Sequence, residues 1–315
     1  MPSLAQTRRG LALGSIAGLG IYRPPSDAPA APRAAGADLG GVSNRVQADQ
    51  GLTTPSLAAG AARAALRVSG VNTSDLEMII VGTTTPDVLW PTTACLVQTE
   101  LKLPMVASFD LYAAETSLLA ALNVGIRYIT SGARAVLLIG AESNNQLVDL
   151  PGQGGAVHGR AAAAAVLTQA GGADGVLSTM AGGAARADLN GDTEDRTLLQ
   201  GLTDGATECL RKAGLMMSEI DLVIGEQSAP EIMHAWSKLA GVSSSRLLMD
   251  PVRYSSVLAA APLAALHDAV NAGRLHNGMT ALLLACGSGP TWAAACVRWG
   301  GAGIAEASPG GNGTA

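Results

Sequence analysis

Glu115 is the residue whose type and position suggest chemistry most directly. It lies within FDLYAAETS (residues 109–117), where an apolar strand turns sharply into an Ala- and Leu-rich helix. The dipole of a helix stabilises an ionised carboxylate at the helix N-terminus, by about 0.3–1 kcal/mol when exposed. Glu115 can therefore act as a helix cap or pocket filler, or as a catalytic carboxylate. Thr116 and Ser117 follow, but no motif supplies the His or Lys base that would make either hydroxyl a nucleophile.

The elements that position this turn follow a regular alternation of β-branched runs and amphipathic helices. Such alternation is typical of an α/β fold in which helices cover a mostly parallel sheet. In the first half, strands are expected at 11–22, 76–83, 105–110 and 135–140, and helices at 56–68, 92–101 and 116–131. In the second half, strands are expected at 222–225, 280–285 and 291–299, and helices at 198–213, 230–240 and 262–272. The second half therefore repeats the order of the first.

Composition excludes several classes of function. The chain has 315 residues, 48% hydrophobic and 14% charged, so it can bury one large core or two fused ones. A formal charge of -5 without a basic stripe argues against nucleic acid as a partner. No apolar run reaches the roughly 20 uncharged residues that a membrane helix needs. The four cysteines have neither zinc-site spacing nor a small secreted framework, which predicts reduced thiols in a soluble, cytoplasmic protein without a metal.

Several further motifs occur in a defined order along the chain. They are VGTTTPD (81–87) with PTTAC (91–95), LNG (189–191), AGL (213–215) and GSGPTW (287–292). Together with the turn at Glu115, they make residues 11–299 resemble ketoacyl-ACP synthase III of the thiolase superfamily. The resemblance implies an α/β thiolase fold, in which two similar βαβαβ halves form a five-layer α-β-α-β-α sandwich. Residues 1–170 would form the N-terminal half with the nucleophile elbow and dimer interface, residues 171–302 the C-terminal half, and residues 303–315 a disordered tail.

The catalytic positions of that family carry different residue types in this chain. Glu115 stands where the family has its nucleophilic Cys, and Glu226, in Gly225-Glu226-Gln227, where it has His. Ser255 takes the place of the Asn, although a shift of one residue would make it Ser256. Without a thiolate there is no ordinary acyl-enzyme, and without His and Asn two donors to an enolate are lost. The resemblance thus implies a degenerate triad of Glu, Glu and Ser.

Two carboxylates in one dry pocket favour acid/base chemistry. Like charge and desolvation raise the pKa of one of them, so Glu115 and Glu226 are expected to share a proton. Alternatively, Glu226 is a solvated carboxylate at a strand end. The resemblance also implies substrate-binding residues and no cofactor: Trp90, which would restrict chain length, and Thr116, Asn190, Gly287, Ser288 and Gly289, the last three in a loop whose backbone helps form an oxyanion hole.

The expected carrier of the substrate depends on residues of the family's CoA site that this chain lacks. A Trp and an Arg that clamp the adenine are expected near residues 36–45, where only Arg45 is present. The segment that covers the substrate tunnel in the family also looks shortened here, since residues 178–188 are small, rich in Gly and Ala, and lack apolar anchors. An acyl group on an acyl carrier protein, or a substrate without a thioester, is therefore favoured over an acyl-CoA.

Two classes of function remain open. The first is an enzyme of a specialised fatty-acid or polyketide pathway that acts on an acyl or β-ketoacyl group by acyl transfer, decarboxylation or cyclisation, with Glu115 and Glu226 as acid and base. The second is a non-catalytic subunit that completes a heterodimeric ketosynthase. A third, acyl transfer to a sugar or amine, is allowed by the fold and supported by no residue. A homodimer or a heterodimer with a ketosynthase paralogue is expected in either case.

Overall fold

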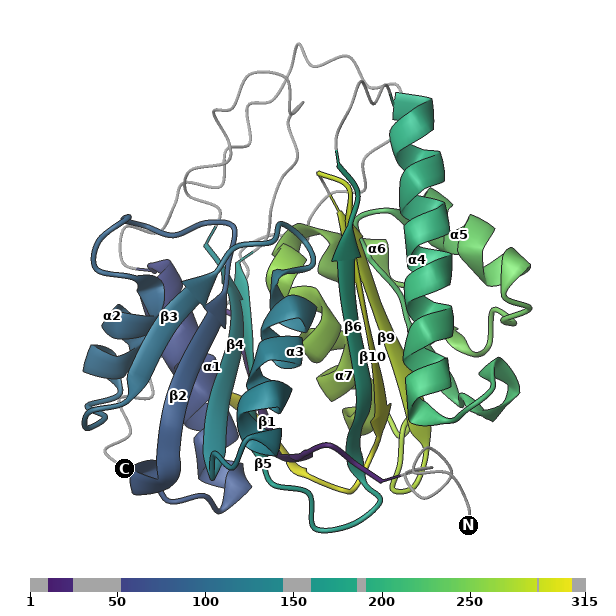
Figure 1. Cartoon of the computed structure of the whole chain (residues 1–315). Coiled ribbons are helices and arrows are strands. Elements are labelled where there is room, and N and C mark those ends of the chain that lie inside the picture. The colour runs from purple at the N-terminus through teal and green to yellow at the C-terminus, as the bar shows by residue number, and fades with distance from the viewer. Residues whose placement is uncertain (1–10, 25–51, 144–159, 186–190, 288, 308–315) are drawn as a thin grey trace.

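Two sheets form the framework of the protein (Figure 1). The computed structural model describes residues 11–24, 52–143, 160–185, 191–287 and 289–307. The six-stranded sheet has the order β11-β1-β5-β4-β2-β3, and the five-stranded sheet the order β6-β10-β9-β7-β8. The strands of the first are β1 (Ser15–Tyr22), β2 (Leu76–Gly82), β3 (Ala107–Leu111), β4 (Ala135–Glu142), β5 (Ala161–Thr168) and β11 (Gly303–Ala307). Those of the second are β6 (Gly175–Gly183), β7 (Leu222–Ile224), β8 (Leu247–Leu248), β9 (Thr280–Gly287) and β10 (Thr291–Arg298).

The same strand order occurs in both halves of the chain. In each half the first strand pairs with the fifth, the fifth with the fourth, the fourth with the second and the second with the third. The second, third and fourth strands run parallel, while the fifth is antiparallel to both neighbours. Among the strands of the described residues, only β11, which pairs with β1, has no counterpart in the other half. The predicted repeat of two similar halves is therefore confirmed.

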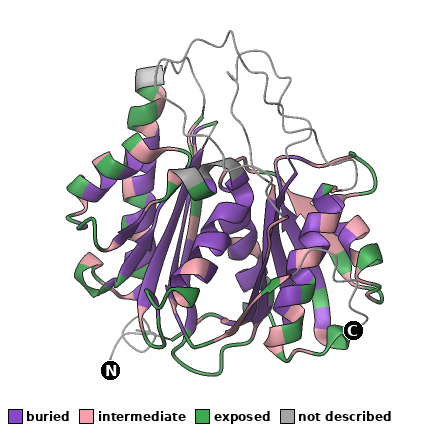
Figure 2. Cartoon of the chain, turned by 180° about the vertical axis from the view of Figure 1, so that it is seen from behind, coloured by how far each residue is buried: buried purple, intermediate pink, exposed green. Residues whose placement is uncertain are grey.

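The helices complete five layers. They are α1 (Thr54–Ser69), α2 (Thr93–Glu100), α3 (Ser117–Thr130), α4 (Gly191–Ala213), α5 (Pro230–Leu239), α6 (Pro251–Tyr254) and α7 (Ala261–Asn271). Helices α1 and α2 cover the outer face of the six-stranded sheet, and α4 and α5 that of the five-stranded sheet (Figure 1). Helices α3 and α7 lie between the sheets and are buried along most of their length (Figure 2). This is the expected α-β-α-β-α sandwich.

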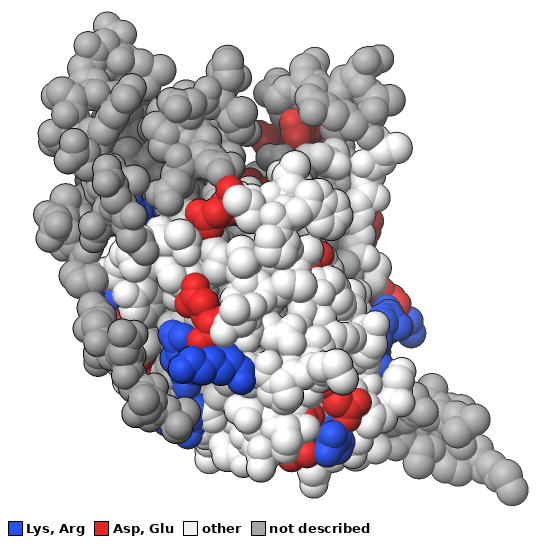
Figure 3. Space-filling model, turned by 90° about the vertical axis from the view of Figure 1, so that its left-hand side faces the viewer, with Lys and Arg blue, Asp and Glu red and all other residues white. Residues whose placement is uncertain are grey.

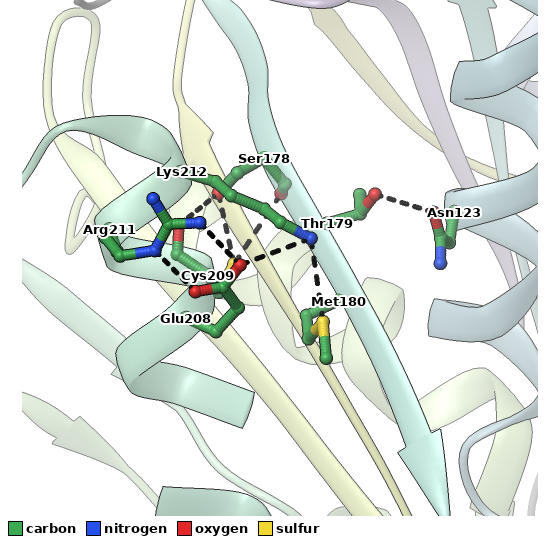
Figure 4. Close-up of polar contacts among 8 residues, drawn as sticks. All are labelled: Asn123, Ser178, Thr179, Met180, Glu208, Cys209, Arg211 and Lys212. Atoms are coloured by element: carbon green, nitrogen blue, oxygen red, sulfur yellow. Dashed lines mark hydrogen bonds and ion pairs between the residues drawn. The ribbon is translucent and has the colours of Figure 1, made fainter. Parts of the chain in front are cut away.

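Strand β6 shows how alternation along one strand connects two layers. The Thr179 hydroxyl donates to the side-chain oxygen of Asn123 on the central helix α3, at 2.9 Å. The Ser178 hydroxyl instead donates to the backbone carbonyl of Cys209 on the outer helix α4, at 2.7 Å (Figure 4). Successive side chains of a strand point to opposite faces, so these two bonds attach the strand to both helices.

The strands correct two sequence-based expectations and add one strand that the sequence did not indicate. Residues 303–307 form β11, which pairs in parallel with β1, so the predicted disorder is wrong for them; residues 308–315 lie outside the described part. Residues 178–183 belong to β6 and do not form part of a lid. Strand β5, an alanine-rich run at 161–168, was not anticipated. In the described residues, no helix is both long and apolar enough to cross a membrane.

Candidate active site

The turn between β3 and α3 presents Glu115. Ala114, which precedes it, has φ of 48°, a left-handed conformation that costs energy for a residue with a Cβ. The Thr116 hydroxyl donates to the carbonyl of Ala113 and the Ser117 hydroxyl to that of Ala114, each at 2.6 Å. The backbone N–H of Ala113 in turn donates to the Ser117 hydroxyl at 2.9 Å. Both hydroxyls therefore maintain the strained turn.

The carboxylate of Glu115 lies against the end of β9. A Cβ built on Gly287 would lie 1.9 Å from Oε2 of Glu115 and 2.6 Å from its Cδ, so only glycine leaves room for this side chain. Glu115 is half-buried, at the start of a helix that passes between the two sheets. The structure thus brings together Glu115 and Gly287, which are 172 positions apart (287 − 115) in the sequence. Both were predicted to belong to one site.

Glu226 lies at the end of β7 and is 3% exposed. The backbone N–H and the hydroxyl of Ser228 donate to its Oε1, at 3.0 and 2.9 Å. Burial raises the pKa of Glu226 to about 7, the two bonds from Ser228 oppose this shift, and the charge of Glu115 adds to it. Because the charge of Glu115 raises the pKa of Glu226, the two carboxylates lie close enough to influence each other. Glu226 is buried, so it is not the solvated carboxylate that the alternative required.

The cysteine nearest this pair is not a substitute nucleophile. Burial raises the pKa of Cys286 far above its usual range, and the negative charges of Glu226 and Glu115 raise it further. Nucleophilic attack requires the thiolate, so this thiol stays inert at neutral pH. Burial also raises the pKa of Cys209 to about 11 and that of Cys296 to about 12. Among the described residues, no group of three His, Cys, Asp or Glu side chains could hold a metal ion.

The third catalytic position lies in the 3₁₀ segment η5 (Ser255–Ala260), between α6 and α7. Ser255 and Ser256 are its first two residues, and the positions of their side chains lie outside the described part of the structure. Leu258, inside η5, has φ of 31° and ψ of −107°. The catalytic role of Ser255 therefore stays a prediction.

The predicted substrate-binding residues have different surroundings. Trp90 is 83% exposed on the loop after β2, which excludes core packing within one subunit. Thr116 is buried, and its hydroxyl lies 3.4 Å from that of Thr291 besides bonding within its own turn. Gly289, with φ of 95°, is exposed in the turn between β9 and β10. Asn190, Ser288 and Arg45 lie outside the described residues.

Sequence reasoning missed a second buried carboxylate near these loops. Glu142, the last residue of β4, is 0% exposed. Its Oε1 accepts from the N–H of Thr84 at 3.0 Å, and its Oε2 from the hydroxyls of Thr84 at 2.8 Å and Thr85 at 2.7 Å. The only signal in the sequence is an acidic residue directly after an apolar strand, where a Glu is seldom fully buried unless paired.

Comparisons with known proteins agree with this architecture. The family model described as 3-oxoacyl-[acyl-carrier-protein (ACP)] synthase III matches residues 109–185, and the model described as the C terminal of that synthase matches residues 210–299. The beta-ketoacyl-[acyl-carrier-protein] synthase III of Aquifex aeolicus is 32% identical over 257 residues, which cover 77% of this chain and 83% of that protein. The synthase III of Bacillus pumilus is 30% identical over 274 residues, covering 82% and 88%.

Solved structures show the same fold. The beta-ketoacyl-[acyl carrier protein] synthase III of Thermus thermophilus has a TM-score of 0.77 and 27% identity, covering 91% of this chain and 100% of that chain. OleA of Xanthomonas campestris shares the fold at 19% identity, with a TM-score of 0.75 and coverage of 91% and 98%. With both family models and these relatives matched, the chain belongs to the ketoacyl-ACP synthase III family of thiolase-fold proteins.

Proposed function

We propose that this chain acts on an acyl or β-ketoacyl group in a specialised fatty-acid or polyketide pathway, without a Cys acyl-enzyme. Its acid and base are Glu115 and Glu226. Family membership supports an acyl-transferring enzyme whose acyl group is carried as a thioester on an acyl carrier protein. The observation that carries the assignment is the buried carboxyl of Glu226, whose pKa of about 7 is raised in part by Glu115.

Acyl transfer from a thioester illustrates how the pair can work. Glu115 acts as the base and takes the proton of the incoming nucleophile while a lone pair of that nucleophile bonds to the carbonyl carbon. The C=O π electrons move to the oxygen and return as the C–S bond breaks, so the sulfur leaves with the electrons of that bond. Glu226, protonated, donates its proton to this sulfur. The proton on Glu115 then restores Glu226, so two carboxylates that share one proton complete a cycle.

Release of the thiol from acyl thioesters tests this function. Acyl and β-ketoacyl groups of several lengths, on CoA and on a carrier protein, would be offered to the purified protein. Glu115→Gln and Glu226→Gln should each lower turnover by about 10²-fold or more, because each removes one proton-transfer group. Glu231→Gln, on the exposed side of α5, is the matched control and should leave the rate unchanged. Rates unchanged in both site variants would exclude the two carboxylates from the mechanism.

A non-catalytic partner subunit is the second candidate, and one surface favours it. Val88, Leu89 and Trp90 are exposed apolar residues on one loop. A subunit retained for its interface needs such a surface and no working site. Co-expression with a Cys-bearing synthase distinguishes the two functions: a stable heterodimer whose partner is inactive alone supports the accessory subunit, whereas a homodimer beside a fully active synthase contradicts it.

A further inference from the structure

The segment before α7 is the counterpart of the turn before α3. In each case a non-glycine residue with positive φ lies three positions before the first residue of a central helix: Ala114 before Ser117 and Leu258 before Ala261. The two helices occupy equivalent places in the two halves. Ala259 in the second half therefore corresponds to Glu115 in the first.

The two strained turns are held by different means. In the first, the hydroxyls of Thr116 and Ser117 bond to carbonyls of the turn itself. The corresponding residues of the second are Ala260 and Ala261, which have no hydroxyl. A conformation such as that of Leu258 costs about 1–3 kcal/mol and persists only when its surroundings impose it. Something outside η5 must therefore hold it.

Glu142 lies where it can hold Leu258 in this conformation. Burial raises the pKa of Glu142, and the backbone N–H of Ala259, the residue after Leu258, lies close enough to the carboxylate to oppose that rise. Strand β4 also approaches η5 at Gly140, where a Cβ would lie only 2.5 Å from the carbonyl oxygen of Ala259. The same carboxylate accepts from Thr84 and Thr85, at the start of the loop that leads to Trp90.

We propose that Glu142 is a positioning residue, whose carboxylate holds η5 in its strained conformation and fixes it to the loop at 84–90. The carboxylate accepts three hydrogen bonds from Thr84 and Thr85 and has the backbone N–H of Ala259 beside it. The ionised carboxylate, which only accepts, matches these donors, whereas an amide at this position would direct an N–H against one of them. The role of Glu142 in orienting Ser255 rests on the proposed function; its role in holding η5 does not.

The other end of η5 has its own anchor. The Tyr254 hydroxyl, directly before η5, donates to the Asp268 carboxylate on α7. Asp268 also accepts from Arg23 at 2.7 Å and forms an ion pair with Arg253 at 2.9 Å. Hydrogen bonds from His267 and Tyr254, with these two cations, lower the pKa of Asp268 to about 2 despite its partial burial. Because this anchor persists when Glu142 is changed, loss of the Glu142 bonds should loosen only the end of η5 near Leu258.

The hydrogen bonds and contacts by which Glu142 holds η5 are called the clamp, and hydrogen exchange measures its strength without any turnover. In Glu142→Gln, amides of residues 257–260 should exchange at least about tenfold faster, while those of β9 and β10 stay unchanged. Glu231→Gln, exposed on α5, should leave both regions unchanged. If Glu142→Gln does not fold, the pair Thr85→Val and Thr85→Ser replaces it. The valine lacks the hydroxyl that donates to Glu142 and should accelerate exchange, whereas the serine retains it and should restore the wild-type rate.

The outcomes separate the clamp from the proposed function. Exchange unchanged at 257–260, or raised equally in β9 and β10, would overturn the positioning role, because the second result shows only a general loss of stability. If the wild type turns over an acyl thioester, kcat should fall in Thr85→Val and recover in Thr85→Ser, with KM nearly constant. An inactive wild type with the predicted exchange pattern would contradict the proposed function and leave the clamp established.

Discussion

At the scale of single residues, the proposed function depends on a pair of carboxylates in place of a thiol at the turn. Glu226 is buried and its pKa is raised to about 7, while Glu115 lies half-buried at the end of β9. A group with that pKa exchanges protons readily at neutral pH. The buried cysteine beside the pair does not, because its thiol stays protonated.

The raised pKa of Glu226 predicts how stability changes with pH. The native state binds this proton more tightly than the unfolded chain, whose carboxyl has the ordinary pKa of 4.5. The contribution of Glu226 to the free energy of unfolding is therefore fully present below pH 4.5, and it is lost as pH rises from 4.5 to about 7. This contribution is on the order of 3 kcal/mol.

Glu226→Gln tests this linkage. Its amide oxygen can still accept from Ser228, but the residue no longer titrates. The free energy of unfolding, measured with urea, should fall between pH 5 and pH 8 in both proteins. The fall should be about 2–3 kcal/mol smaller in Glu226→Gln than in the wild type. A decrease remains in the variant because burial also raises the pKa of Glu142 to about 7. Identical pH dependence in the two proteins would contradict the buried, proton-binding state of Glu226.

The sequence predicts part of this site. Glu115 and Glu226 are identified because each lies within a motif at the end of a strand. Glu142 was not found, because its partners Thr84 and Thr85 are 58 and 57 positions away and only the pairing of β4 with β2 brings them near. The special geometry of Leu258 is equally hidden, since nothing in SSVLAA indicates a positive φ.

At the scale of elements, alternation and turns predict most helices and strands to within a few residues. Strand β5 is the instructive exception. Its sequence AAAAAVLT has high helix propensity and no polar alternation, yet it lies in the middle of the sheet with seven of its eight residues buried. A strand covered on both faces, by α1 and α7, needs no polar positions, so the period of two disappears. Tertiary packing overrides local propensity here.

Small residues also set the distance between elements. A Cβ on Gly20, in β1, would lie 2.3 Å from the backbone nitrogen of Ala65 and 2.4 Å from the carbonyl oxygen of Ala61, both on α1. Backbone atoms of a packed helix cannot move aside independently. Gly20→Ala should therefore lower stability by about 2–3 kcal/mol, and Tm by roughly 3–5 °C. Gly171→Ala, where nothing lies within 4 Å, is the control and should leave Tm unchanged. Equal Tm values for the two variants would show that α1 does not pack closely on β1.

At the scale of the whole molecule, β3 ends the six-stranded sheet and leaves one edge without a partner strand in the described chain. Unprotected edges promote pairing with another chain. On the side of the molecule that carries β3 and α2, charged side chains are gathered in a few clusters, with uncharged surface between them (Figure 3). Leu89 and Trp90, on the loop after β2, are 80% and 83% exposed. These features together favour a dimer that forms at this edge, and for the proposed enzyme the second subunit is another copy of this chain.

The loop at 84–90 supplies the residue that tests this dimer. Leu89→Glu places a charge in the centre of the proposed interface and should raise the dimer dissociation constant about 100-fold, the effect expected of a central contact. Since Leu89 is exposed in the single subunit, its replacement should leave folding intact. Leu239→Glu, at the end of α5 and 68% exposed, adds the same charge away from β3 and should leave the dimer unchanged. Sedimentation equilibrium measures the dimer dissociation constant of each variant. Two results would contradict an interface at this edge: a wild type that is monomeric at micromolar concentration, or an equal weakening of the dimer by both changes.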